Sequence, residues 1–122
     1  MMFPFSRDKK RVTVEEARRR TRGTDAPDVL LDVRERGEWA AGRAPGAVHA
    51  PLSALVAGAA LPKAALGRPL TVICRSGNRS RRAAELLRAR GAEAVDVRGG
   101  MEQWAAAGYP VVGGSGDEGS PA

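Results

Sequence analysis

The chain has 122 residues, a length that suits one domain built around one hydrophobic core. Its single cysteine excludes an internal disulfide framework, and one cysteine with one histidine leaves too few soft ligands for a zinc site. The formal net charge is +6, and because no apolar run has the length of a transmembrane helix or a signal-peptide core, we expect a cytoplasmic protein without metal, cofactor or membrane contact.

The N-terminal end carries most of this charge. Residues 1–22 hold eight basic and three acidic side chains, which leaves the rest of the chain close to neutral. We interpret residues 1–10 as a flexible basic arm that is solvated, although a basic segment also suits RNA or an anionic membrane. Because we prefer the solvated interpretation, we do not expect a nucleic acid as partner. An acidic protein or RNA stays an open alternative for this arm.

Five apolar segments alternate with helical segments from residue 11 to residue 112. Expected strands lie at Val12, Val29–Val33, Ala47–Ala50, Leu70–Ile73 and Ala94–Val97. Expected helices and turns are Val14–Arg22 with Thr13 as cap, Glu35–Ala41, a short helix capped by Ser53 through Val56, a turn at Pro62, a helix after Ser80 closed by Gly91, and Met101–Ala106. This alternation predicts an α/β domain with a parallel sheet covered by helices on both faces, followed by a disordered tail over 113–122.

The clearest candidate for chemistry is Cys74, which directly follows the clearest central strand, Leu70–Ile73. Ligands of open parallel sheets bind beyond the carboxyl ends of the strands, where this cysteine lies. The segment Cys74–Arg79 is a polar, glycine-containing loop that leads into a helix, and the backbone N–H groups of such a loop form an anion site. The helix dipole and the nearby Arg75 and Arg79 favour the thiolate.

A thiolate attacks an electron-poor sulfane sulfur without removal of a proton in that step, so no histidine base is needed. The only histidine, His49, lies in another segment. The alternative is that Cys74 is a small buried hydrophobic residue at a strand end, as most lone cysteines are. The polar loop after it packs poorly but binds anions well, which favours the chemical interpretation.

Four segments together resemble the rhodanese-homology family of sulfurtransferases. They are Leu31–Glu35 with Glu38-Trp39, Gly42–Ala47, Cys74–Arg79 with Ser80, and Gly99–Trp104 with Gly108–Val111. Their order and spacing match the family over about residues 11–112, which we expect to form one rhodanese-like domain.

This resemblance implies a three-layer α/β/α fold with a five-stranded parallel sheet. It also implies that Cys74 accepts a sulfane sulfur from a small anionic donor such as thiosulfate and passes it, as a persulfide, to cyanide, a thiol or an acceptor protein. By position, Arg75 and Arg79 select the donor, and Ser76, Gly77 and Asn78 form the backbone cradle. The supporting residues that the resemblance indicates are Asp32, Arg34 and Ser80.

The family commonly has histidine where this chain has Arg43, and we expect this to alter local hydrogen bonds more than activity. Phosphatases and arsenate reductases of the same fold use a cysteine, five intervening residues and an arginine, whereas only four residues separate Cys74 from Arg79. A non-catalytic regulatory module is the main alternative, which the intact cysteine loop disfavours. The spacing of Arg34 and Glu38 predicts an ordinary helical ion pair.

Overall fold

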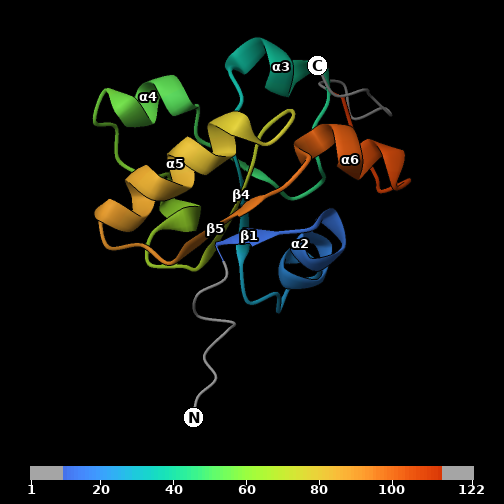
Figure 1. The fold of residues 1–122 in the computed structure, drawn as a ribbon, viewed down its shortest axis with the longest axis horizontal. Coiled ribbons are helices and arrows are strands. Elements are labelled where there is room, and N and C mark those ends of the chain that lie inside the picture. The colour runs from blue at the N-terminus through green and yellow to red at the C-terminus, as the bar shows by residue number, and fades with distance from the viewer. Residues whose placement is uncertain (1–9, 114–122) are drawn as a thin grey trace.

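Five parallel strands form one sheet in the order β1-β5-β4-β2-β3 in the computed structural model, which describes residues 10–113. The strands are β1 (Arg11–Val12), β2 (Val29–Asp32), β3 (Val48–His49), β4 (Leu70–Ile73) and β5 (Ala94–Val97). The helices are α2 (Val14–Thr21), α3 (Arg36–Ala41), α4 (Leu52–Val56), the 3-10 turn η1 (Lys63–Ala65), α5 (Asn78–Ala89) and α6 (Gly100–Ala106). This arrangement confirms the predicted three-layer α/β/α fold (Figure 1).

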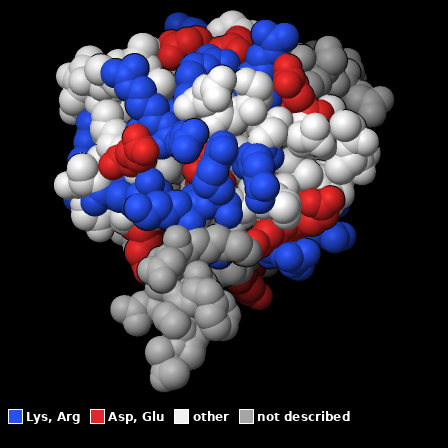
Figure 2. Space-filling view, viewed as in Figure 1, with Lys and Arg blue, Asp and Glu red and all other residues white. Residues whose placement is uncertain are grey.

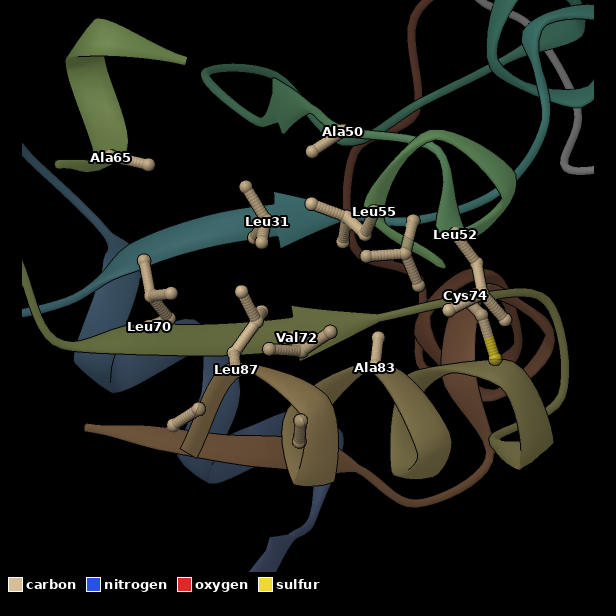
Figure 3. Packing of buried hydrophobic residues seen from close by; sticks show 13 residues of the cluster. Leu31, Ala50, Leu52, Leu55, Ala65, Leu70, Val72, Cys74, Ala83 and Leu87 are labelled. Atoms are coloured by element: carbon tan, nitrogen blue, oxygen red, sulfur yellow. The ribbon is translucent and has the colours of Figure 1, made fainter. Parts of the chain in front are cut away.

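The two faces of the sheet carry separate hydrophobic clusters. On one face, alternate β4 residues Leu70 and Val72 pack with Leu52 and Leu55 of α4 and with Leu87 of α5 (Figure 3). The other cluster joins Ile73 of β4 to residues of α2 and α6, among them Val14, Ala17, Met101 and Trp104. Because β4 is buried on both sides, it is mostly apolar, and its one polar side chain, Thr71, donates its hydroxyl to Asp28 Oδ2 at 2.8 Å.

Two helix starts, those of α4 and α5, differ from the sequence expectation by more than one residue. Thr13 does cap α2, since its Oγ1 accepts the N–H of Glu16 at 3.2 Å. Ser53, however, is not the cap of α4: that helix begins at Leu52 after Pro51, and the Ser53 hydroxyl donates to Glu35 at 2.7 Å. Likewise α5 begins at Asn78, two residues before Ser80, so the second half of the expected loop is helical.

The described range leaves out parts of two predictions. The flexible arm expected at 1–10 lies outside the described residues except for Lys10, and the tail expected at 113–122 lies outside except for Gly113. Within residues 10–113, none of the helices has the length and apolar character needed to span a bilayer.

Candidate active site

Cys74 lies directly after β4, at the carboxyl end of the central strand, with only 1% of its surface exposed. In Figure 3 its sulfur points toward the beginning of α5. The N–H of Gly77 donates to Cys74 Sγ at 3.2 Å, and the thiol donates to Ser80 Oγ at 3.4 Å. When the sulfur is a thiolate, the Ser80 hydroxyl donates to it instead of accepting from it. Both neighbours can therefore stabilise a negative sulfur.

The start of α6 packs against the outside of this loop. The N–H of Met101 donates to the carbonyl of Cys74 at 2.8 Å, and the N–H of Glu102 donates to the carbonyl of Arg75 at 3.0 Å. A Cβ on Gly100 would lie 2.3 Å from Cys74 O and 2.6 Å from Arg75 O. Glycine at position 100 therefore permits the backbone approach that fixes the two carbonyls.

The edge strand holds the loop from a third side. Gly77 has a φ of 110°, in the left-handed region that favours glycine, and its carbonyl accepts from Arg11 Nη2 at 3.0 Å. Arg11 in turn forms an ion pair with buried Asp96 of β5 at 2.9 Å. Backbone groups and a strand-borne arginine thus position the loop, while the side chains of Ser76 and Asn78 are exposed.

Arg79 of α5 is paired with a carboxylate of α3. Its Nη1 and Nη2 donate to Glu38 Oε1 and Oε2 at 2.5 and 2.6 Å, and both side chains are partly buried. The hydrogen bond from Arg79 lowers the pKa of Glu38 to about 2, and the same bond raises the pKa of Arg79, to which the charge of the Cys74 sulfur also contributes. The predicted ion pair between Arg34 and Glu38 is therefore wrong.

Arg34 pairs instead with Asp32, two residues before it. Arg34 Nη2 donates to Asp32 Oδ2 at 2.8 Å and to the carbonyl of Gly42 at 2.6 Å, while Nε donates to both Asp32 oxygens. Both side chains are fully buried, and Arg34 Nη1 has no hydrogen-bond partner among the described residues. The pair lies at the end of β2, next to β4, and fastens the turn that leads into α3.

Arg43, which stands where the family that this chain resembles commonly has histidine, lies over Trp39. Its Cζ is 5.0 Å from the ring centroid, and its backbone pairs with Val112 in an antiparallel bridge. The other stacking partner of Trp39 is His49, with ring centroids 4.6 Å apart. The Nε2 of His49 lies 2.7 Å from the carbonyl of Arg34, so this nitrogen carries a hydrogen and donates.

Within the predicted loop and the helix after it, Gly77 and Ser80 thus contact one buried sulfur, while Asp32 lies at the end of β2, next to β4, and Arg34 follows two residues beyond that strand. Sequence reasoning gave no site role to Arg11, Glu38, Gly100 and Glu102, although the last three lie in segments that carry the family resemblance. Of these, the Gly99-Gly100 pair alone left a local signal, because adjacent glycines indicate a tight turn. The carboxylates that pair with Arg75 and Arg79 come from distant segments, so no local sequence pattern predicts these two ion pairs.

Known proteins with similar sequences and structures were compared with this chain. The sequence profile of the rhodanese-like domain matches residues 13–107. A Yarrowia lipolytica protein named adenylyltransferase and sulfurtransferase UBA4 is 33% identical over 98 residues, which are 80% of this chain and 24% of that protein. The chain therefore spans about a quarter of the length of this curated relative.

Two solved structures share the fold over most of the chain. The rhodanese-like domain of Alr3790 from Anabaena is 28% identical with a TM-score of 0.72, and the match covers 86% of this chain and 80% of that one. The human single-domain sulfurtransferase TSTD1 is 29% identical with a TM-score of 0.65, and the match covers 80% of this chain and 96% of that one.

Proposed function

Because the chain belongs to the rhodanese-like domain family, we propose that it is a sulfurtransferase that carries a sulfane sulfur as a persulfide on Cys74. The single observation that supports this most strongly is the hydrogen bond from the Gly77 N–H to Cys74 Sγ at 3.2 Å. A backbone donor aimed at a buried sulfur stabilises an anionic sulfur, which a purely structural cysteine does not need.

In the first step the Cys74 thiolate attacks the outer sulfur of thiosulfate or another persulfide donor. A new bond forms between the two sulfurs, the bond inside the donor breaks, and sulfite leaves with the electron pair when thiosulfate is the donor. In the second step a thiophilic acceptor attacks the outer sulfur of the persulfide, and the electron pair of the broken bond returns to Cys74 Sγ. Neither step needs a cofactor or a base.

The loop stabilises the charged states of this cycle. The first N–H groups of α5 have no partner inside the helix, and together with the Gly77 N–H they form the anion site that holds the persulfide. We assign the backbone cradle to Ser76, Gly77 and Asn78. Arg75 and Arg79 bind an anionic donor in this account, but each must exchange a carboxylate partner to do so, Glu102 and Glu38 respectively.

The supporting residues act through position. The buried Asp32–Arg34 pair fixes the end of β2 beside Cys74, and Ser80 holds the sulfur from within α5. A reducing compartment such as the cytoplasm keeps a lone reactive thiol available, and we place the reaction there.

Initial-rate kinetics test this proposal. Rates measured against thiosulfate at several cyanide concentrations should give parallel double-reciprocal lines, because the donor product leaves before the acceptor binds. The Cys74→Ser variant should be inactive. Intersecting lines, or turnover that survives in Cys74→Ser, would rule out a persulfide intermediate on this residue.

A further inference from the structure

Six arginines lie in or beside the active-site loop. They are Arg11, Arg75, Arg79, Arg81, Arg82 and Arg98. Arg11 contacts the carbonyl of Gly77, and Arg98 directly precedes Gly99, whose nitrogen packs against Gly77. Arg81 and Arg82 follow within the first turns of α5, roughly 5–6 Å along the helix from Asn78 at 1.5 Å per residue.

Three of these arginines, which we call the inner arginines, are already paired. Arg11, Arg75 and Arg79 form ion pairs with Asp96, Glu102 and Glu38 at 2.9, 3.3 and 2.5 Å. Each carboxylate cancels much of the field that its arginine would exert on a ligand close to the sulfur. The positive charge nearest Cys74 is therefore largely compensated inside the protein.

The other three, which we call the outer arginines, have no ion-pair partner within residues 10–113. Arg81, Arg82 and Arg98 are exposed. Helix α5 carries four arginines and one glutamate, Glu85. Figure 2 shows the result from outside: Lys and Arg side chains gather over α5, β1 and β5, on the face that contains the loop.

We propose that Arg81, Arg82 and Arg98 form a docking surface for an acidic protein whose cysteine thiol accepts the sulfur from Cys74. The inference rests on the sulfurtransferase function proposed above and names its acceptor. A small anion at the sulfur faces arginines that are already paired. An acidic protein docked over the loop also covers the outer arginines. Its carboxylates then approach these arginines to less than the ~10 Å over which charges act at 0.1 M salt.

The surroundings of the loop favour a protein over a nucleic acid. Single-stranded nucleic acids are bound by stacking of bases on open aromatic faces. In residues 10–113 the aromatic rings are engaged with neighbours: Trp39 with His49 and Arg43, and Trp104 with Tyr109. The transfer itself also calls for a thiol, which a protein cysteine supplies.

The transfer step balances without a further reactant. The acceptor thiolate attacks the outer sulfur of the Cys74 persulfide, and a new sulfur–sulfur bond forms on the acceptor. The bond to Cys74 Sγ breaks, and its electron pair stays on Cys74 as a thiolate that the Gly77 N–H stabilises. No net oxidation or reduction occurs.

Synthetic peptides serve as probes for the experiment. The protein is loaded with thiosulfate, desalted and mixed with peptides of equal length that carry one cysteine flanked either by glutamates or by glutamines. The ratio of the two transfer rates is compared between the unmutated protein, Arg81→Glu/Arg82→Glu, and the matched control Lys63→Glu/Arg68→Glu. The control introduces the same charge change on exposed residues of the connection that enters the opposite end of β4. Comparing proteins with the same peptides removes the effect of flanking charges on the peptide thiol itself.

At low salt, we expect the ratio of the transfer rate to the glutamate peptide over that to the glutamine peptide to be about tenfold higher in the unmutated protein than in Arg81→Glu/Arg82→Glu. We expect this difference to vanish near 0.5 M salt. The control variant should keep the unmutated ratio. Equal ratios in all three proteins would overturn the docking surface while leaving the sulfurtransferase intact. Tight binding of a single-stranded RNA that Arg81→Glu/Arg82→Glu abolishes, without any peptide preference, would also overturn it. Failure of Cys74 to take up sulfur from thiosulfate or from polysulfide would overturn both proposals.

Discussion

The carboxylate of Glu38 holds the guanidinium of Arg79 through two hydrogen bonds, of 2.5 and 2.6 Å, across 41 residues of sequence. This contact joins α3 to the first turn of α5, directly beside the loop that contains Cys74. It fixes the position of Arg79 and at the same time offsets its charge. Any anionic donor that uses Arg79 has to compete with a carboxylate of the protein itself.

Replacing Glu38 should therefore change how the protein treats a dianionic donor. In Glu38→Gln the charge of Arg79 is no longer compensated, and we expect the KM for thiosulfate to fall about three- to tenfold, which is less than the ~1.5–3 kcal/mol of a full charge-assisted hydrogen bond. Steady-state kinetics with saturating cyanide measure this. Glu85→Gln, which removes a carboxylate from the solvent face of α5, is the control and should leave KM within twofold. A KM in Glu38→Gln that is equal to or higher than that of the unmutated protein would contradict a donor-binding role for Arg79.

The pH dependence of the same ion pair follows from its pKa. Arg79 lowers the pKa of Glu38 from its ordinary value of 4.5 to about 2. A lowered folded-state pKa means that the stabilisation is complete above the unfolded value of 4.5 and is lost as pH falls through about 2. NMR titration of the Glu38 side-chain carboxyl carbon should give a midpoint near 2, and in Arg79→Ala the midpoint should return toward 4.5. A midpoint near 4.5 in the unmutated protein would show that the pair does not persist in solution.

Gly100 permits the contact between α6 and the loop, and its replacement separates steric conflict from backbone strain. An added Cβ would lie 2.3 Å from the carbonyl oxygen of Cys74. Gly108 is a matched control, because it also has a positive φ but open space where the Cβ would be. We expect Gly108→Ala to lower the free energy of unfolding by about 1–2 kcal/mol through backbone strain alone. Gly100→Ala should lower it by at least about 2 kcal/mol more, because the added Cβ also meets the loop. Thermal unfolding measures both, and equal losses for the two variants would show that the loop yields to the added methyl group.

The buried Asp32–Arg34 pair should be stabilising only as a pair. Arg34→Met leaves a fully buried carboxylate without its guanidinium, which costs about 3–5 kcal/mol. The double variant Asp32→Val/Arg34→Met removes both charges, so we expect it to be more stable than Arg34→Met alone. Urea unfolding of the unmutated protein, both single variants and the double variant gives the coupling free energy between the two side chains. Additive losses would mean that the two side chains are held independently.

The central strand and its loop could be predicted because their information is local. An apolar run such as Leu70–Ile73 is what burial on both faces requires, and glycine with polar residues directly after it indicates a turn at a strand end. The sequence predicts too late a start for α5, because Asn78 and Arg79 have the composition of loop residues. In the structure they form the first helical turn, with Gly77 at the cap position.

The partners of the charged residues could not be predicted, because tertiary structure decides them. Arg34 and Glu38 have helical spacing, but α3 begins at Arg36, so Arg34 lies outside the helix and reaches back to Asp32. Glu38 turns to Arg79, a residue that the sheet order brings beside α3. Serine is a common helix cap, yet the hydroxyl of Ser53 donates its hydrogen bond to the carboxylate of Glu35, 18 residues earlier.

The central claim is that Cys74 carries the transferred sulfur, and the intact mass of the protein tests it most directly. After incubation with thiosulfate and desalting, the protein should gain the mass of one sulfur atom, and addition of cyanide should remove it. Cys74→Ser is the control and should gain nothing. An unmutated protein whose mass does not change, or a sulfur adduct that persists in Cys74→Ser, would contradict the account.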